Sequence, residues 1–162
     1  MRRKTKLQRI LNSSLSVKML HAEAYLCLAW GRIFKLLPFA KVSASLGAPM
    51  KETSAAPCTE QELRLLKQVS KAVHRMSRYT WWESQCLVKA VAAMVMLERR
   101  GVESTLYLGS GRDAQGRMAA HAWLRSGSYL VTGAEGHELY AVVGIFAKQP
   151  SRKGLKPERS GV

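Results

Sequence analysis

Residues 86–101 have the sequence CLVKAVAAMVMLERRG, and this stretch decides the fold that we expect. Between Cys86 and Leu97 the only charged residue is Lys89. A helix that is apolar nearly all round is one that is buried on all sides. Gly101 then stands where glycine commonly follows the end of a helix. The stretch therefore predicts a central helix surrounded by the rest of the domain.

After this helix the periodicity changes to that of strands. Strands are predicted over 104–108, 119–125 and 128–132, and 141–146 is a candidate for a last strand. The second and third of these are joined by a tight turn that contains Gly127, which favours an antiparallel hairpin. Because helices come first and strands follow, the sequence predicts an α+β fold.

Two helices are predicted upstream of the central one. Thr59 and Glu62 have the spacing of a capping box, so a helix should begin at residue 60. Residues 5–37 are expected to form one or two helices, ended by Pro38. The apolar stripe that we assign to them consists of Leu15, Met19, Ala22, Leu26, Ala29, Ile33 and Leu36.

Four segments follow from these patterns. Residues 1–42 form a basic, apolar helical extension, and 43–58 are small, polar residues typical of a linker. Residues 59–147 form the main domain, and 148–162 are a basic tail with the composition of a flexible segment.

The net charge of +15 lies mainly at the two ends of the chain. Residues 1–41 contribute +8 and residues 148–162 contribute +4, whereas the middle is nearly balanced. Basic ends suit nucleic acid, an anionic membrane surface or an acidic protein, or they act as solubilising tails. Nucleic acid is the least expected partner, because no folded basic face interleaved with aromatic residues is evident.

Cysteine usage and hydropathy indicate a cytoplasmic protein, with attachment to the membrane periphery as an alternative. Cys27, Cys58 and Cys86 are far apart in sequence and have no zinc-ligand spacing, so neither a disulfide framework nor a metal site is expected. The longest stretch of residues 17–39 without an ionisable residue is 24–31, far short of the roughly 20 residues that span a bilayer.

Cys86 and His121 are the residues most suited to catalysis. Cys86 begins the buried helix, where unpaired backbone N–H groups and the helix dipole stabilise a thiolate and can donate to an oxyanion. His121 lies within a predicted strand between small residues, and a strand packed on the helix would bring its imidazole to the thiol. The alternative is that both are ordinary core residues.

Several motifs occur in the order found in one enzyme family. They are WxxxCLVKA at 82–90, LxRRGV at 97–102, LYLG at 106–109 and AHAWL at 120–124. With them, residues 60–146 resemble the leader peptidases of lasso-peptide biosynthesis, which are transglutaminase-like cysteine proteases. The basic N-terminal segment that ends in LLPF at 36–39 resembles the stand-alone form, which lacks a precursor-recognition domain.

This resemblance implies a papain/transglutaminase-like core and peptide-bond hydrolysis. Cys86 would be the nucleophile and His121 the general base and acid, with no metal and no organic cofactor. The implied partners are the precursor peptide, a separate leader-recognition protein and an ATP-dependent macrolactam cyclase. The N-terminal helix is expected to contact either a partner protein or a membrane surface.

Three further residues have roles that the sequence leaves open. The family orients its histidine with an acid on or just after the next strand, but 128–132 contains none. Glu135 is the nearest acid downstream, and the Thr132 hydroxyl or a backbone carbonyl is an alternative. Gln85 either donates a side-chain N–H to the oxyanion or is simply a polar residue at a helix N-terminus. Trp82 lines the substrate cleft or else covers the end of the buried helix.

Two other functions compete with the peptidase. The first is a non-catalytic basic protein that binds nucleic acid or a partner. The second is an acyl transferase on the same fold, because an acyl-enzyme accepts an amine as readily in principle as water.

Overall fold

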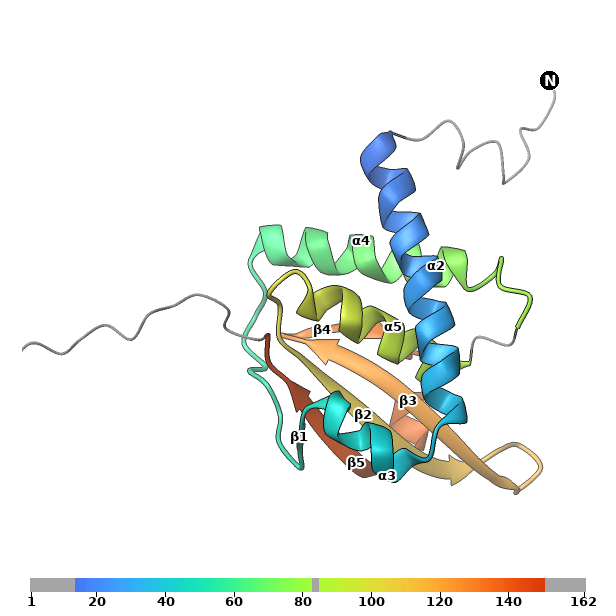
Figure 1. Ribbon diagram of the computed structural model, residues 1–162. Coiled ribbons are helices and arrows are strands. Elements are labelled where there is room, and N and C mark those ends of the chain that lie inside the picture. The colour runs from blue at the N-terminus through green and yellow to red at the C-terminus, as the bar shows by residue number, and fades with distance from the viewer. Residues whose placement is uncertain (1–13, 83–84, 151–162) are drawn as a thin grey trace, which may run out of the picture.

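The computed structural model describes residues 14–82 and 85–150 and confirms an α+β architecture. Its helices are α2 (Leu15–Leu36), α3 (Phe39–Val42), α4 (Glu60–Met76) and α5 (Cys86–Glu98), with the 3-10 helices η1 (Ser43–Leu46) and η2 (His137–Leu139). Its strands are β1 (Ala48–Pro49), β2 (Ser104–Arg112), β3 (Met118–Ser126), β4 (Tyr129–Thr132) and β5 (Ala141–Lys148). Figure 1 shows α2, α4 and α5 covering one face of the sheet.

Helix α5 is the predicted central helix. It contacts α2 and α4 on one side and β2, β3 and β4 on the other. Eight of its 13 residues are buried, among them Ala90, Ala92 and Ala93, whose small side chains permit close approach from several directions. The prediction drawn from residues 86–97 is therefore confirmed.

The sheet has five antiparallel strands in the order β1-β5-β2-β3-β4. All four predicted strands are present, and β1 was not predicted because it contains only two residues. Leu106, Leu124, Val131 and Phe146 belong to the same buried cluster as α5. The core thus lies between the sheet and the helices.

The capping box predicted for α4 is present. The Thr59 hydroxyl accepts from the Glu62 backbone N–H at 3.3 Å, and the Glu62 carboxylate accepts from the Thr59 N–H at 2.8 Å. These two bonds satisfy backbone donors that the helix itself leaves unpaired, which fixes where α4 begins.

Helix α2 buries a different face from the one that we predicted. The predicted stripe is mostly exposed, with Leu15, Met19 and Leu26 each about two thirds or more accessible. The buried residues are His21, Ala24, Cys27, Leu28, Gly31 and Phe34. Small residues explain the choice, because a Cβ on Gly31 would lie 2.8 Å from the Val88 carbonyl oxygen. Close packing of α2 on α5 at Gly31 therefore selects this face, which also buries the larger side chains of Leu28 and Phe34.

An ion pair ties α2 to the C-terminal end of α5. The Arg100 guanidinium donates to both oxygens of the Glu23 carboxylate, at 2.6 and 3.0 Å, and Arg99 lies 3.6 Å from the same group. The hydrogen bond from Arg100 holds the pKa of Glu23 below its ordinary value. The segment expected to be an extension is therefore joined to the main domain by charge as well as by apolar contacts.

Glu23→Gln is expected to lower the free energy of unfolding at pH 7 by about 1 kcal/mol, since one charge-assisted pair is weakened. The depressed pKa gives the sign of the pH dependence. The stabilisation is present above the ordinary glutamate pKa and is lost as the pH falls through the lower pKa of the folded state. Urea unfolding of both proteins from pH 7 to pH 3 should show the difference closing at acid pH, and a constant difference would contradict it.

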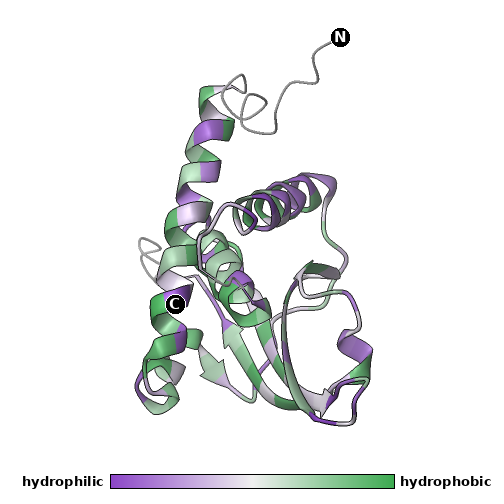
Figure 2. Ribbon diagram, turned by 90° about the vertical axis from the view of Figure 1, so that its right-hand side faces the viewer, coloured by the Kyte–Doolittle hydropathy of each residue, from purple (hydrophilic) through white to green (hydrophobic). Residues whose placement is uncertain are grey.

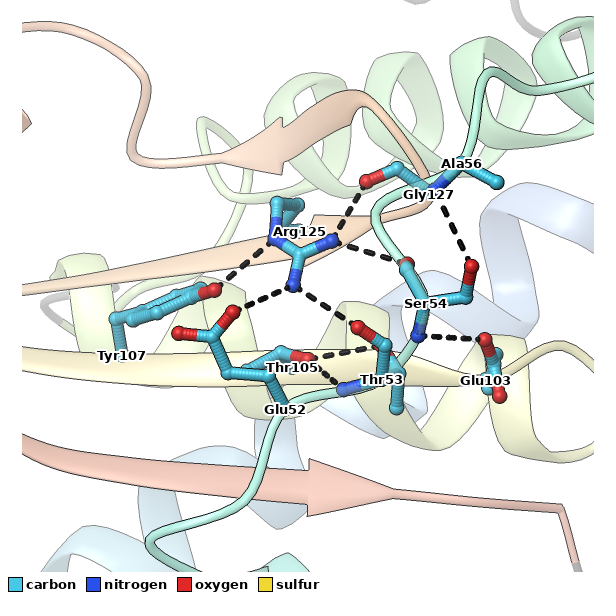
Figure 3. Close-up of polar contacts among 9 residues, drawn as sticks. All are labelled: Glu52, Thr53, Ser54, Ala56, Glu103, Thr105, Tyr107, Arg125 and Gly127. Atoms are coloured by element: carbon cyan, nitrogen blue, oxygen red, sulfur yellow. Dashed lines mark hydrogen bonds and ion pairs between the residues drawn. The ribbon is translucent and has the colours of Figure 1, made fainter.

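The segment 43–58, expected to be a linker, contains η1 and β1 and is bound to the sheet. Arg125 of β3 donates to the carbonyls of Thr53 and Ser54 at 3.2 and 3.0 Å, and to the Glu52 carboxylate at 3.2 Å. It also donates to the Tyr107 hydroxyl at 3.0 Å (Figure 3). This half-buried guanidinium adds polar anchoring at 52–54 to the apolar contact that Leu46 of the same segment makes with the core.

Arg125→Lys is expected to lower the free energy of unfolding by about 2–3 kcal/mol. One ammonium cannot satisfy partners on several sides as the planar guanidinium does, and carbonyls buried without a donor are costly. Thermal unfolding of the variant checks this, with exposed Arg64→Lys on α4 as the matched control. Equal melting temperatures for Arg125→Lys and the wild type would contradict the anchoring role.

Candidate active site

Cys86 is the first residue of α5 and is half-buried. Gln85 occupies the N-cap position in an extended conformation, but its side chain does not cap the helix, and the first turn has no acidic residue. Among the described residues, no side chain therefore accepts from the backbone N–H groups of this turn. A helix start of this kind favours a thiolate or a developing oxyanion beside it.

The other two cysteines are in different surroundings. Cys27 is buried between α2 and α5, and burial, followed by the charge of Glu23, raises the pKa of its thiol. Cys58 is half-buried and its thiol donates to the Ser126 carbonyl at 3.5 Å. Neither begins a buried helix. All three are free thiols.

His121 lies in β3 and has a defined tautomer. Its Nε2 is 2.9 Å from the carbonyl oxygen of Gly133. A carbonyl only accepts, so Nε2 carries the proton, and the lone pair of the neutral ring is on Nδ1. The ring lies between Trp123 and Tyr140, with centroid distances of 5.8 and 5.0 Å. His121 is thus held in orientation with its basic nitrogen available.

Gly133 is the residue that permits this contact. Its φ of 70° lies in the left-handed region, which favours glycine. A Cβ there would be 2.4 Å from the Ala122 carbonyl oxygen and 2.8 Å from the Trp123 Cβ. The chain after β4 therefore passes against β3 at a distance that only glycine allows, and this places its carbonyl at the imidazole.

The structure brings the elements of the predicted pair together but not their reactive atoms. Helix α5 packs on β3, where Leu124 faces the core and His121 lies on the same side as Trp123. The hydrogen bonds of the described residues do not include one between the Cys86 thiol and the His121 imidazole. Alternation along β3 puts Leu124 on the face packed against α5, and His121 with Trp123 on the opposite face, so the imidazole points away from the helix that carries Cys86. The pairing of Cys86 with His121 stays a prediction.

The imidazole is oriented by a backbone carbonyl and not by an acid. Glu135 is exposed, and the described residues give it no hydrogen bond to His121. The Thr132 hydroxyl, the other alternative, is buried without a hydrogen-bond partner among those residues. A backbone carbonyl was the remaining alternative. The sequence could not identify which one, because only the fold reveals which carbonyl reaches the ring.

Gln85 and Trp82 flank the cysteine in different ways. The Gln85 amide oxygen accepts from the Lys35 ammonium of α2, so the amide NH₂ is the end left to donate to an oxyanion. Trp82 packs against the core and lies 5.4 Å from both the Tyr25 and Trp81 rings. Its position favours covering the junction of α2 and α5, while Trp81 is 87% exposed.

The described residues contain neither a metal-binding cluster nor a membrane-spanning helix. Within 14–82 and 85–150, no group of three or more His, Cys, Asp or Glu side chains is placed to hold a metal ion. In the same ranges, no helix has the length and hydropathy needed to cross a membrane.

Comparison with known proteins places the chain at the level of a superfamily. No curated protein and no solved structure matches it significantly. A family model does match residues 25–144, which begins inside α2 and ends in β5. This range includes the helix that starts at Cys86 and the strand that carries His121. The chain belongs to the transglutaminase-like superfamily.

Proposed function

We propose that this protein is a cysteine endopeptidase that removes the leader from a ribosomally synthesised lasso-peptide precursor. The observation that carries the proposal is Cys86, a half-exposed thiol at the uncapped start of a buried helix in a transglutaminase-like domain. The finer assignment to lasso-peptide precursors rests on the motifs at 82–90, 97–102 and 120–124.

In the proposed reaction the Cys86 sulfur attacks the carbonyl carbon of the scissile peptide bond, and the thiol proton passes to His121, the base that the family resemblance implies. This step requires the imidazole to turn from the far face of β3 toward α5. The first-turn N–H groups of α5 and the Gln85 amide stabilise the oxyanion. His121 then returns its proton to the leaving amine as the peptide C–N bond breaks. Water, deprotonated by His121, hydrolyses the thioester and restores the thiol.

The proposed partners are a separate leader-recognition protein and an ATP-dependent macrolactam cyclase. The described part of the chain is occupied by the helices and sheet of one domain, which is why leader recognition is assigned to another protein. A cytoplasmic location is proposed because the three cysteines are free, as is usual in reducing compartments.

An acyl transferase on the same fold is the second candidate, favoured by membership of a superfamily that includes both chemistries. The two differ only in what attacks the thioester. Adding methylamine to the reaction separates them, because a transferase gives the N-methyl amide in place of the free carboxylate. Mass spectrometry distinguishes these products directly.

The first test is alkylation with iodoacetamide over a range of pH, followed by peptide mapping. Cys86 should be alkylated faster than Cys27 and Cys58, and His121→Ala should remove this difference. Cys27 and Cys58 serve as internal references. If Cys86 reacts as a free thiol both alone and with precursor and recognition protein present, the proposed function fails.

A further inference from the structure

The outer face of α2, formed by Leu15, Met19, Leu26, Trp30 and Ile33, is a large apolar surface with no partner among the described residues. These residues recur at steps of three, four and seven, so they line one side of the helix. The opposite side packs on α5 and α4. An amphipathic helix that uses one apolar face for its domain rarely exposes a second one without a reason.

The N-terminal turns of α2 project from the domain, and Met19 and Leu26 of the outer face also line a hollow between α2 and α4. In Figures 1 and 2 the first turns of α2 extend past α4, and α2 stands at the side of the molecule. Figure 2 also shows hydrophobic residues continuing from the C-terminal turns of α2 into α3, where Phe39 is half exposed.

The charges around the outer face are almost all positive. Lys18 follows Leu15 by three residues, so it lies along the edge of the outer face, and Arg32 lies farther round the helix, beside Ala29. Glu23 is the only acidic residue before position 52, and it is engaged by Arg99 and Arg100. Residues 1–13 add five further basic residues to the sequence directly before α2.

We infer that the outer face of α2 binds the surface of an anionic lipid bilayer. Apolar side chains and an indole would enter the interface while Lys18 and Arg32 meet lipid phosphates, which is how interfacial helices bind. Tryptophan is enriched at membrane–water interfaces, where Trp30 would lie. A second copy of the chain is disfavoured, since it would bring two cationic helices with no free acid together. The inference is independent of the proposed peptidase activity.

Co-sedimentation of the full chain with vesicles tests this directly. Binding is expected to phosphatidylcholine vesicles that contain phosphatidylglycerol, to weaken as salt is raised, and to be much weaker with phosphatidylcholine alone. Leu26→Glu should reduce partitioning by about ten-fold or more, because it places a charge at the centre of the face. No binding to the anionic vesicles would overturn the inference.

The matched control is Val143→Glu on β5, because Val143 is 67% exposed and Leu26 is 69% exposed. Neither substitution removes a buried contact, so both variants should fold, and only Leu26→Glu should lose vesicle binding. Equal binding by both variants would overturn the assignment of the face.

A second pair of variants tests the charges. Lys18→Gln with Arg32→Gln should weaken binding by about ten-fold, whereas Lys51→Gln with Lys67→Gln, equal in charge, should have little effect. Sedimentation velocity without lipid tests whether a second copy of the chain occupies the outer face. If the wild type is a dimer and Leu26→Glu a monomer, a second copy covers the outer face and the inference is wrong.

Discussion

Replacing Cys86 by alanine is expected to abolish cleavage of the precursor, with a loss of at least about 10³-fold in kcat. No other thiol in the described structure begins a helix, so none can substitute as nucleophile. The variant should remain folded, because a half-exposed thiol contributes little to the core. Mass spectrometry of precursor digests, with thermal unfolding measured in parallel, gives both results.

The matched controls are the other two cysteines. Cys58→Ala should keep full cleavage, and Cys27→Ala should keep cleavage while lowering stability by about 1 kcal/mol, since Cys27 is buried between two helices. Cleavage retained in Cys86→Ala would show that the nucleophile is elsewhere. Cleavage lost in Cys58→Ala with the fold intact would have the same meaning.

Gly133→Ala is expected to lower kcat by about 100-fold without removing any catalytic side chain. The added Cβ would lie 2.4 Å from the Ala122 carbonyl oxygen, so the chain must move away from β3 and take the Gly133 carbonyl with it. His121 would then lose the acceptor that fixes its tautomer. A displacement of about 1 Å at a positioning group can cost this much in rate. Steady-state cleavage kinetics measure the effect, and the pH profile of kcat should change as well.

Gly136→Ala in the same loop separates positioning from backbone strain. Gly136 also has a φ near 70°, but a Cβ there would meet only the end of the Leu139 side chain at 3.8 Å. Both variants should lose about 1 kcal/mol of stability from the left-handed conformation, and only Gly133→Ala should lose activity. Glu135→Gln is expected to stay within about two-fold of the wild-type rate. A large loss in Glu135→Gln would restore the acid as the orienting group.

Local patterns were sufficient for the elements of this fold. The uninterrupted apolar run at 86–97 predicts a central helix because no side of it tolerates water, and alternation predicts the strands that pack on it. The capping box at Thr59 is equally local, since its donors and acceptors lie within four residues. The elements around Cys86 and His121 were predicted on this basis.

The choice between two apolar faces of α2 was not local. Leu15, Met19 and Leu26 form as regular a stripe as Ala24, Cys27 and Gly31, and periodicity cannot rank them. The close approach of α2 to α5 at Gly31 settled the choice, because a Cβ there would meet the Val88 carbonyl oxygen. Leu15, Met19 and Leu26 were left outside, where they form part of the outer face.

The sequence by itself determined the α+β class, the central helix with Cys86 at its start, and the strand that carries His121, since each depends on residues adjacent in the chain. The tertiary structure decided what each of these meets. Gly133 reaches His121 because a left-handed glycine lets a distant segment pass against β3. Arg125 donates to the carbonyls of Thr53 and Ser54, and these contacts could not be predicted either, because main-chain carbonyls have no sequence signature. Contacts made by backbone atoms become visible only when the chain is folded.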